Sequence, residues 1–294
     1  MKSGFVSIIG RPNVGKSTLL NSLITRKVAI TSDKSGTTRN IIQGIYNEPD
    51  YQIVFVDTPG IHKPIGKFGK VLNKQALSLT KDVDLILFMV DVASGIGTGD
   101  MFILDMLKGS DVPVILVLNK IDRLSEEKLF KVIDANKDIF PFVEIVPVSA
   151  IKNDNTSHLI DVIKKYLKDE VMYFPEEMYT SSSLNFMVAE IVREKLLNVT
   201  EDEVPHSITC YTVSFTEKKD LVNILVDIVI DRESLKKIII GHNGSRLKEI
   251  GTLARIEIEE LVGKKVYLEL FVKTVKNWKE KEKYLVELGF IDNE

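Results

Sequence analysis

The sequence has few of the features that define a secreted or membrane protein. A single cysteine, Cys210, excludes an intramolecular disulfide framework and favours a reducing compartment. No run approaches the roughly 20 apolar residues that a membrane-spanning helix needs, and the N-terminal stretch MKSGFVSIIG lacks the organisation of a signal peptide. We therefore expect a cytoplasmic protein in which Cys210, within the apolar run 207–215, is a buried structural thiol.

The sequence also lacks an excess of positive charge. The formal net charge is −3 over 294 residues, so a nucleic-acid partner would have to be recognised by a local region rather than by the whole surface. A hydrophobic content of 44% is sufficient for a sizeable core. Because the length exceeds that of one average domain, we expect two domains.

Residues 1–170 alternate between short apolar runs and amphipathic stretches. The apolar runs are nearly continuous, as in the strands of a parallel sheet covered on both faces; they are residues 5–10, 51–57, 84–91, 112–119 and 142–149. Helical spacing lies between them, for example over 15–24 and 125–140. This alternation predicts a three-layer α/β domain with a mostly parallel sheet.

A different organisation follows a predicted linker, residues 171–183, which is rich in proline, acidic residues and serine. Beyond it the pattern predicts the order α-β-β-α-α-β, which defines a smaller α+β domain over 184–294. The predicted elements are a helix at 183–197, strands at 207–215 and 221–230, helices at 232–238 and 245–261, and a strand at 265–272.

The segment GRPNVGKS fits the pattern G-x-x-x-x-G-K-[ST] between a predicted strand and a predicted helix. Backbone N–H groups at a helix N-terminus favour anions, and glycine lets the backbone approach phosphate oxygens. Lys16 is predicted to reach the β- and γ-phosphates of a nucleotide, and the Ser17 hydroxyl to bind Mg²⁺. The predicted contacts of this loop are Gly10, Arg11, Pro12, Asn13, Val14, Gly15, Lys16, Ser17 and Thr18.

A second nucleotide signal is VFVDTPG, in which Asp57 ends a predicted strand. A carboxylate at that position can reach the metal, usually through water, and the N–H of Gly60 can donate to the γ-phosphate. Downstream of a phosphate-binding loop this pattern predicts a switch element. Its predicted contacts are Asp57, Thr58, Pro59, Gly60 and Ile61.

The third signal, NKID, ends another predicted strand and selects the base. A buried Asp122 carboxylate can accept hydrogen bonds from guanine N1–H and the 2-amino group, and adenine would leave it unpaired. Asn119 is predicted to tie this region to the phosphate-binding loop, and the Lys120 stem to cover the base. In the following VSAI stretch, Ser149, Ala150 and Ile151 are predicted contacts, with the Ala150 N–H donating to guanine O6.

Together these motifs resemble the Era family of the TrmE-Era-EngA-type P-loop GTPases. The matching stretches are GRPNVGKST, GTTR, DTPGIHKP, NKID and VSA, and the resemblance extends over essentially the whole chain. It implies a GTP-hydrolysing protein that binds GTP, GDP and 16S-type ribosomal RNA near its 3′ end. It also implies a role in assembly of the 30S subunit, with no DNA partner.

The resemblance also predicts switch and metal residues. Thr38 completes the Mg²⁺ shell with Ser17 and Asp57, and Thr37 is the neighbouring alternative. Asn13 corresponds to an asparagine that holds a potassium ion near the phosphates in related GTPases. Many GTPases orient the attacking water with a glutamine after the switch glycine; Ile61 cannot do so, and slow intrinsic turnover is expected.

The stretch IIIGHNGSRLKEIG contains a G-x-x-G loop between two predicted helices. In this α-β-β-α-α-β context it resembles a type II KH domain, whose loop clamps about four nucleotides of single-stranded nucleic acid. Relatives often carry lysine in this loop. The predicted RNA contacts are Gly241, His242, Asn243, Gly244, Ser245, Arg246, Lys248, Lys236 and Lys237.

The C-terminal stretch, residues 273–290, is predicted to be a helix with lysines on one side and Trp278 and Tyr284 on the other. A docking helix with a solvated face is favoured, and peripheral contact with RNA or an anionic membrane is the alternative. For the whole chain, the alternative functions are an RNA-modification or metabolic GTPase whose KH-like domain docks protein, and an ATP-dependent kinase, which would have no use for NKID.

Overall fold

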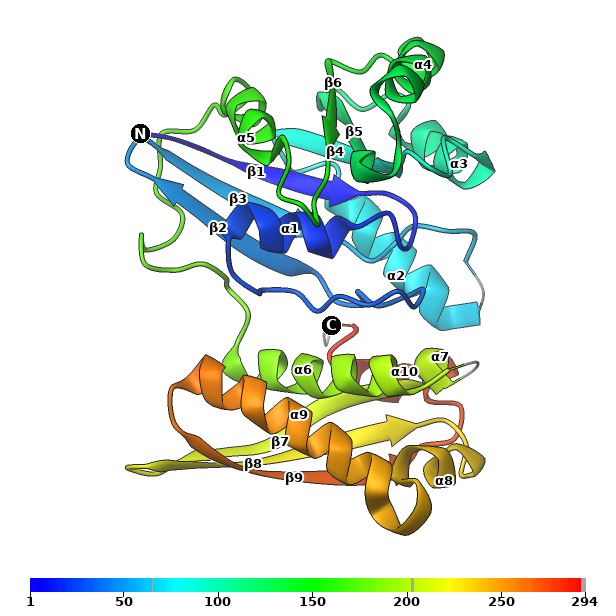
Figure 1. Ribbon diagram of the computed structural model, residues 1–294, viewed down its shortest axis with the longest axis vertical. Coiled ribbons are helices and arrows are strands. Elements are labelled where there is room, and N and C mark those ends of the chain that lie inside the picture. The colour runs from blue at the N-terminus through cyan, green and yellow to red at the C-terminus, as the bar shows by residue number, and fades with distance from the viewer. Residues whose placement is uncertain (65, 202–203, 292–294) are drawn as a thin grey trace. The chain divides into compact units, whose positions relative to one another are not determined.

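The computed structural model describes residues 1–64, 66–201 and 204–291, and these residues form two compact units (Figure 1). The first unit holds the described residues up to 181, apart from two short segments, 32–37 and 66–68. The second unit holds these two segments and the described residues from 182 onward. The predicted linker therefore divides between the units, with most of it belonging to the first.

The first unit is built from six strands with helices between most of them; residues 66–68, at the start of one of these helices, are the short segment assigned to the second unit. Its elements are β1 (Lys2–Ile9), α1 (Lys16–Ile24), β2 (Ile42–Glu48), β3 (Tyr51–Asp57), α2 (Gly66–Ser78), β4 (Leu85–Asp91), α3 (Thr98–Leu107), β5 (Val114–Asn119), the 3₁₀ turn η1 (Ile121–Arg123), α4 (Glu126–Asn136), β6 (Glu144–Val148) and α5 (Thr156–Lys164). The sheet order is β2-β3-β1-β4-β5-β6. Only β2 runs antiparallel to its neighbour, so the predicted mostly parallel α/β domain is confirmed.

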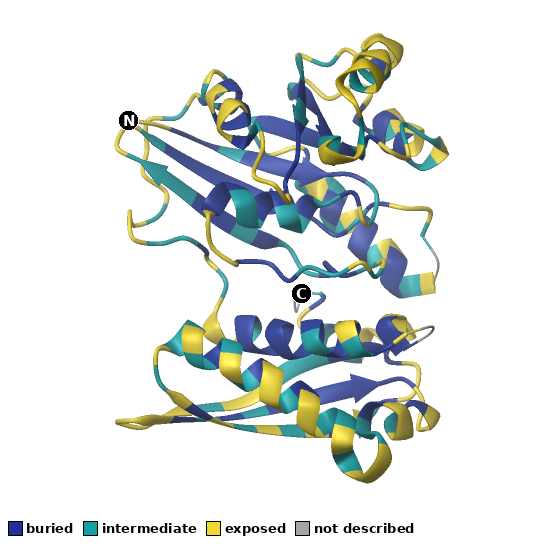
Figure 2. Cartoon of the chain, in the orientation of Figure 1, coloured by how far each residue is buried: buried dark blue, intermediate teal, exposed yellow. Residues whose placement is uncertain are grey.

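The central strands β1, β3, β4 and β5 are buried almost throughout, as their continuous apolar sequences predict (Figure 2). One core cluster joins β4 and β5 to apolar residues of α2, α3 and α4, and α1 lies beside α5, β2 and β3. Helices therefore cover both faces of the sheet. With strands β1, β3, β4, β5 and β6 parallel, their carboxyl ends meet at one edge, where α/β proteins place their ligands.

Strand β2 was not predicted from the sequence. It is an edge strand that carries polar residues and a glycine, Gly44, so its hydrophobic alternation is weak. The glycine is required by packing, because a Cβ atom there would lie 2.6 Å from the Leu20 side chain and 3.0 Å from that of Ile24. Helix α1 therefore lies directly against this part of the sheet.

Residues 169–180 run along the first unit without a helix or strand of their own, and they include a turn in which the Met178 N–H donates to the Pro175 carbonyl. The Ser3 N–H donates to the Asp169 carbonyl at 2.8 Å, and the Gln52 amide donates to the Phe174 carbonyl at 2.8 Å. Gly44 and Thr180 form an isolated antiparallel bridge. Most of the predicted linker is therefore hydrogen-bonded to the first unit rather than free.

The second unit is a three-stranded sheet with helices packed on one face. Its elements are α6 (Leu184–Val199), α7 (Val204–Ser207), β7 (Ile208–Glu217), β8 (Leu221–Ile230), α8 (Ser234–Ile240), η2 (His242–Gly244), α9 (Ser245–Val262), β9 (Lys265–Thr274), η3 (Trp278–Glu280) and α10 (Glu282–Glu287). Strand β8 pairs antiparallel with β7 and parallel with β9. The predicted type II KH domain is confirmed.

Two predictions in this unit are wrong. Residues 273–290 do not form one helix, because β9 continues to Thr274 and only two short helical segments, η3 and α10, follow. Trp278 lies fully buried, and its indole N–H donates to the Ser207 carbonyl at 3.3 Å. Cys210 is partly rather than fully buried. It belongs to β7, an edge strand whose further residues are increasingly exposed.

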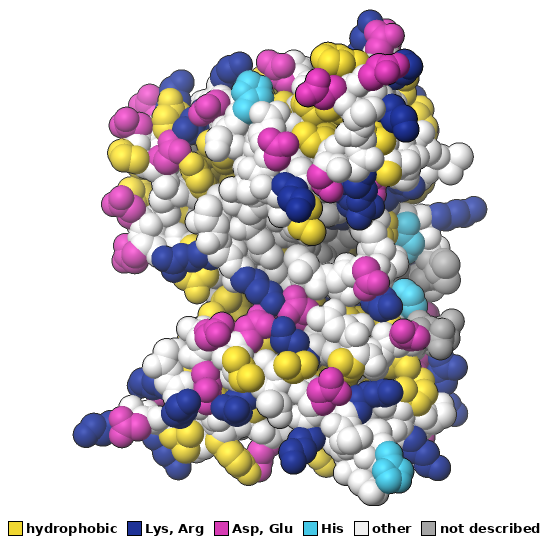
Figure 3. All heavy atoms as spheres, in the orientation of Figure 1, with side chains coloured by type: hydrophobic (Ala, Val, Ile, Leu, Met, Phe, Trp, Pro, Cys, Tyr) yellow, Lys and Arg dark blue, Asp and Glu magenta, His cyan; other side chains and the backbone are white. Residues whose placement is uncertain are grey.

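Among the described residues, none of the helices combines the length and apolar character required to cross a bilayer. On the face shown in Figure 3, acidic and basic side chains are intermixed. Neither sign of charge dominates this face.

Candidate functional site

The phosphate-binding loop follows β1 and leads into α1, as the sequence predicts. Gly10 and Gly15 are required by close approach as well as by conformation. A Cβ atom on Gly10 would lie 2.5 Å from the Met89 carbonyl oxygen, and one on Gly15 would lie 2.3 Å from the Asn119 side-chain nitrogen. With φ angles of 155° and 103°, both also adopt backbone conformations that glycine tolerates best.

Lys16 lies within this loop with its side chain buried. Its ammonium donates to the backbone carbonyl oxygens of Gly10, at 3.2 Å, and Arg11, at 3.0 Å. Burial lowers the pKa of Lys16 to about 8, and the nearby Asp57 carboxylate opposes that shift. The charge of Lys16 is therefore poorly compensated and available to an anionic ligand.

Three oxygen-bearing side chains meet beside this lysine. The Ser17 hydroxyl donates to Asp57 Oδ2 at 2.6 Å and lies 2.7 Å from the Thr38 hydroxyl, which itself lies 3.4 Å from Asp57 Oδ2. The Thr37 hydroxyl instead donates to the Lys34 carbonyl at 2.7 Å. The geometry therefore favours Thr38 over Thr37 as the residue that joins Ser17 and Asp57.

The Asp57 carboxylate is fully buried, and its second oxygen, Oδ1, has no hydrogen-bond partner among the described residues. Burial raises the pKa of Asp57 to about 6, although Lys16, Ser17 and Thr38 each favour the ionised form. A buried anionic oxygen without a partner is costly. Such an oxygen beside two hydroxyls suits a hard cation such as Mg²⁺, which prefers oxygen ligands and often uses one carboxylate with substrate phosphates.

The segment after Asp57 returns to the phosphate-binding loop. The Thr58 hydroxyl donates to the Ile8 carbonyl at 2.9 Å, and Gly60 lies so close to Pro12 that an added Cβ would approach it within 2.8 Å. Ile61 is fully buried in the core, with its N–H donating to the Gly10 carbonyl at 3.2 Å. Its side chain thus points away from the site, as expected for a residue that does not orient water.

His62, the next residue, is exposed, and its Nδ1 lies 3.1 Å from the Gly60 carbonyl. The Asn73 amide donates to the His62 carbonyl at 2.6 Å. This contact fixes the backbone of His62. Its imidazole is near the switch glycine, but no described contact gives it the role of a base.

Asn119 is buried and joins three loops. Its amide donates to the Val14 carbonyl at 2.8 Å, and its oxygen accepts the Ala150 N–H at 3.0 Å. The predicted tie to the phosphate-binding loop is therefore present. The predicted donation from Ala150 to guanine O6 stays a prediction; in this arrangement the Ala150 N–H donates to Asn119, and a base would have to share or replace that acceptor.

Asp122 lies in the short turn η1, and its Oδ1 accepts the Ser149 hydroxyl at 2.5 Å. Contrary to the sequence-based expectation, the carboxylate is exposed. Because the turn lies at the surface, the protein itself does not shield the carboxylate from water, and only a bound base would do so. Ile151 is also strongly exposed, at 74%, beside this turn in the chain that follows β6. Ser149, by contrast, is fully buried, and its hydroxyl joins the segment after β6 to this turn.

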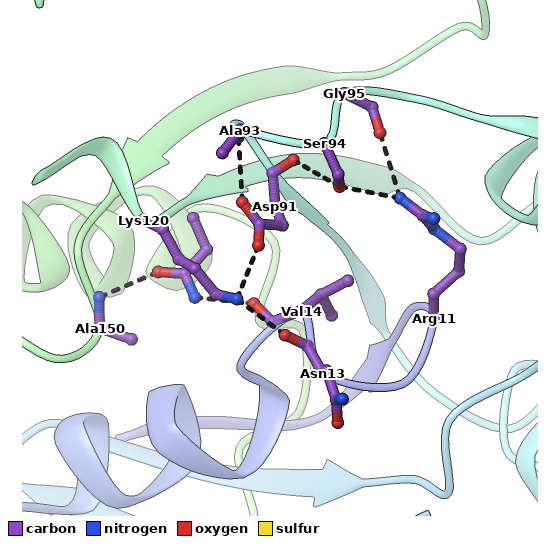
Figure 4. A network of polar contacts seen from close by, with 10 residues as sticks. Arg11, Asn13, Val14, Asp91, Ala93, Ser94, Gly95, Lys120 and Ala150 are labelled. Atoms are coloured by element: carbon purple, nitrogen blue, oxygen red, sulfur yellow. Dashed lines mark hydrogen bonds and ion pairs between the residues drawn. The ribbon is translucent and has the colours of Figure 1, made fainter. Parts of the chain in front are cut away.

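Two acidic residues were missed by the sequence analysis. Asp91 ends β4 and forms an ion pair of 2.6 Å with Lys120, whose ammonium also donates to the Asn13 carbonyl at 2.9 Å (Figure 4). Asp100, in the first turn of α3, forms an ion pair of 2.7 Å with Arg11. A signal was available for Asp91, because it ends an apolar strand just as Asp57 and Asn119 do.

The G-x-x-G loop of the second unit joins α8 to α9 and contains η2. Gly241 and Gly244 have φ angles of 74° and 78°, and Asn243 between them has 49°. These left-handed conformations favour glycine and are tolerated by asparagine. A Cβ atom on Gly241 would lie 2.8 Å from the Arg246 Cβ, so the loop turns tightly onto the start of α9. His242 and Asn243 are exposed at its tip.

The basic residues predicted to contact RNA beside this loop differ in whether their side chains are exposed or already paired within the protein. Lys237 and Lys248 are exposed, as is Ser245. Lys236 lies 3.6 Å from the Glu233 carboxylate, and the Arg246 guanidinium donates to the Ile238 carbonyl at 2.7 Å. Arg246 therefore also caps the end of α8, and the exposed lysines are better placed to meet phosphate.

Comparison with known proteins identifies both units. Residues 5–120 match the family model for 50S ribosome-binding GTPases, and residues 203–279 match the KH domain model. The chain is 48% identical over 291 residues to GTPase Era of Geobacter metallireducens, covering 98% of each protein. The chain belongs to the Era family of GTPases.

Other members of the Era family agree with this assignment. GTPase Era of Alkaliphilus oremlandii is also 48% identical, over 98% of this chain and 99% of its own. A crystal structure of Era in complex with MgGDPNP and nucleotides 1506–1542 of 16S ribosomal RNA matches with a TM-score of 0.96 at 42% identity, over 99% of both chains. A crystal structure of a variant of Aquifex aeolicus Era bound to GDP·AlF₄⁻ gives the same values. This chain is therefore a GTPase with a KH domain.

Proposed function

We propose that this chain is a GTP-dependent switch that binds small-subunit ribosomal RNA near its 3′ end and acts in assembly of the 30S subunit. The observation that carries the proposal is the presence, in one chain, of a phosphate-binding loop with a three-oxygen cluster and a G-x-x-G loop with both glycines in the left-handed region. Its Era relative in complex with MgGDPNP and 16S ribosomal RNA nucleotides has the same two-unit organisation.

The nucleotide would be held by the residues around the first loop. Lys16 supplies the cation for the phosphates, and Asp122 supplies the acceptor for guanine N1–H and its 2-amino group. The oxygens of Ser17, Thr38 and Asp57 fit Mg²⁺, which when bound supplies charge neutralisation between the β- and γ-phosphates. Ser17 and Asp57 would hold their positions in either nucleotide state, whereas Thr38 belongs to a loop without regular structure.

We also propose slow intrinsic hydrolysis. Ile61 is buried and apolar, so the residue after the switch glycine contributes nothing to the position of an attacking water. Asn13 is the residue through which K⁺ would add positive charge near the phosphates, as the family resemblance implies. Turnover measured in KCl and in NaCl tests this point, and equal rates would remove K⁺ from the mechanism.

The RNA would be clamped by the loop from Gly241 to Gly244, with backbone N–H groups at the start of α9 facing phosphate. His242 and Asn243 stand where such loops commonly carry lysine. The positive charge that attracts phosphate would therefore come from other exposed residues, such as Lys237 and Lys248. Any control by GTP requires that GTP and RNA favour the same state of the protein, which is a coupling free energy between the two sites.

The lysine-rich residues from 273 onward are the proposed site of any peripheral contact with an anionic membrane, and the protein is proposed to work in the cytoplasm. Flotation with anionic and with neutral vesicles tests the membrane contact. Recovery of the protein with neither kind of vesicle would exclude it.

RNA binding is tested by fluorescence anisotropy with a labelled oligonucleotide of the 3′ end of 16S ribosomal RNA. Titrations with a non-hydrolysable GTP analogue and with GDP measure the nucleotide dependence. Replacement of both exposed loop residues, His242→Asp with Asn243→Asp, should weaken binding by roughly 30-fold or more, because two negative charges would face the phosphates. The matched control is Lys219→Ala, an exposed residue at the β7–β8 turn.

The alternative function is a GTPase whose KH domain docks a protein instead of RNA. It predicts equal and weak RNA binding with either nucleotide, and no effect of the aspartate pair. Strong RNA binding that the aspartate pair abolishes and the control retains would exclude this alternative.

A further inference from the structure

The segment from Asp91 to Asp100 leads from β4 into α3. It contacts the phosphate-binding loop and, at a separate point, the NKID stretch at 119–122, which we call the base loop (Figure 4). We call it the 91–100 segment. It contains none of the motifs that identify a nucleotide site, and neither end of it was predicted to be functional. All of its contacts described below lie within the first unit.

One end of the 91–100 segment receives the side chain of Arg11. The guanidinium forms an ion pair of 2.7 Å with Asp100, and its Nη2 donates to the Ser94 hydroxyl at 3.1 Å and to the Gly95 carbonyl at 3.2 Å. Gly99 makes room for the arginine stem, because a Cβ there would lie 2.8 Å from Arg11 Cδ. Arg11 is therefore enclosed by one short stretch of chain.

Asp100 is itself fixed. Its side chain is fully buried, and Oδ2 also accepts the Gly97 N–H at 2.8 Å, which caps the start of α3. Its other oxygen has no hydrogen-bond partner among the described residues. A buried carboxylate is retained at low cost only when a cation compensates it. Here the compensating cation comes from Arg11 of the phosphate-binding loop.

The other end of the 91–100 segment contacts the base loop through an ion pair. Asp91 Oδ2 pairs with Lys120, and Asp91 Oδ1 accepts the Ala93 N–H at 3.0 Å. Lys120 adopts a left-handed conformation, with φ of 69°, and donates to the Asn13 carbonyl. Asp91 therefore orients a lysine that spans from the base loop to the phosphate-binding loop.

The position of Arg11 affects atoms that meet the phosphates. Its carbonyl oxygen accepts a hydrogen bond from Lys16, and the next residue, Pro12, packs directly against Gly60. A shift of the Arg11–Pro12 peptide would therefore move both the lysine and the glycine proposed to sense the γ-phosphate. The arginine side chain points away from the phosphates into the 91–100 segment, so it acts through its backbone.

We propose that Arg11 is a positioning residue for the terminal phosphate, held by the ion pair with Asp100, and that the 91–100 segment fixes the phosphate-binding loop and the base loop separately. The inference rests on the proposed nucleotide site. The two ends of the segment have different functions. The Arg11 end affects GTP more than GDP because Pro12 contacts Gly60, whereas the Asp91 end affects both nucleotides equally because Lys120 borders the base.

The test compares dissociation constants for fluorescent GTP and GDP analogues, with kcat and KM for GTP, in four main variants, to which Asp100→Asn and its combination with Arg11→Met are added for the ion pair. Arg11→Met retains the stem that packs at Gly99 and removes the charge. It should weaken GTP binding roughly tenfold and GDP binding less than threefold, as expected for loss of a charge-assisted contact. Arg11→Lys should restore part of the loss, since its ammonium still compensates Asp100. Asp91→Asn should weaken both nucleotides by the same factor.

The fourth variant, Lys108→Met, is the matched control. Lys108, the residue that follows α3, pairs with Asp105 on the exposed surface of that helix, so replacement of its charge by methionine should alter neither constant. Arg11→Met with Asp100→Asn should be no worse than the more damaging single change, because both remove one ion pair. Should Asp100→Asn fail to fold, the two Arg11 variants decide the question, since Arg11 is 30% exposed.

Two results would overturn the inference: unchanged constants in Arg11→Met, or equal losses for GTP and GDP. The wild-type protein is measured beside the variants for its preference of GTP over ATP. Absence of that preference would refute the nucleotide assignment itself. Its presence together with an unaffected Arg11→Met protein would refute only the role given to Arg11.

Discussion

Replacing Asp57 by asparagine should stabilise the nucleotide-free protein while removing its use of Mg²⁺. The carboxylate is fully buried, and burial raises its pKa to about 6 from an ordinary value of 3.8. Asparagine has nearly the same shape and can still accept the Ser17 hydroxyl. The substitution therefore removes a buried negative charge without creating a cavity.

The magnitude follows from the pKa shift. A raised carboxyl pKa means that the folded state holds a proton between about pH 4 and pH 6 that the unfolded state has lost, so stability falls as pH rises through this window. Above pH 6 the loss is complete. A shift of about two units corresponds to roughly 3 kcal/mol, and we expect Asp57→Asn to raise the free energy of unfolding of the first unit by about 1–3 kcal/mol at pH 7.

Urea unfolding at pH 7 and at pH 4.5 measures this effect. The only tryptophan, Trp278, lies in the second unit, so its fluorescence follows that unit, while circular dichroism follows both. The first unit should gain stability at pH 7 and much less at pH 4.5, where the wild-type carboxyl is largely protonated in the folded protein. Asp111→Asn, at an exposed position, is the matched control and should change neither value.

A destabilising effect of Asp57→Asn at pH 7, or an equal effect at both pH values, would contradict this expectation. In either case the carboxylate would not carry a desolvation cost in the folded state. A separate titration with Mg²⁺ and GTP should raise the melting temperature of the wild-type protein, and it should raise that of Asp57→Asn much less.

Three further results are expected. Asp122→Asn should weaken GTP binding roughly 100-fold, since one or two charge-assisted hydrogen bonds to guanine are lost, and it should improve binding of xanthosine triphosphate; competition against a fluorescent GDP analogue measures both. His242→Lys should tighten RNA binding at low salt and steepen the dependence of log affinity on log salt by roughly 0.7, which anisotropy over a salt series would reveal. Gly241→Ala should destabilise the second unit by about 1–2 kcal/mol, because φ is 74° and the new Cβ would meet Arg246, and urea unfolding followed by Trp278 fluorescence would detect it.

The sequence predicted best those residues that lie at strand ends. Asp57 and Asn119 each follow an apolar run, and parallel strands bring such residues to one edge of the sheet. Asp91 has the same position on β4, yet its role was not predicted, because the segment that follows it contains no phosphate-binding pattern. Its ion pair with Lys120 becomes evident only when the end of β4 and the NKID stretch are placed side by side in the fold. Ion pairs between distant segments depend on tertiary packing that periodicity does not describe.

Exposure was the less predictable property. Asp122 and Cys210 were both expected to be buried, but each lies near the end or edge of an element where packing depends on neighbouring segments. The helical spacing of residues 273–290 also predicted a longer helix than the structure contains. Residues such as Lys273 and Thr274 have helical neighbours in sequence, but they extend β9, which pairs with β8 over its whole length. Tertiary pairing overrode local helical propensity there.

The buried charges of the site explain why the loop depends on its ligand. Burial lowers the pKa of Lys16 to about 8 and raises that of Asp57 to about 6, so each charge is disfavoured by folding even though the two attract. An anion beside Lys16 and a cation beside Asp57 would relieve both costs together. A nucleotide bound with Mg²⁺ supplies both charges in one ligand, whereas phosphate alone or Mg²⁺ alone supplies one. Binding of nucleotide and metal should therefore be strongly cooperative, and loss of that cooperativity in Asp57→Asn would locate its origin in this pair.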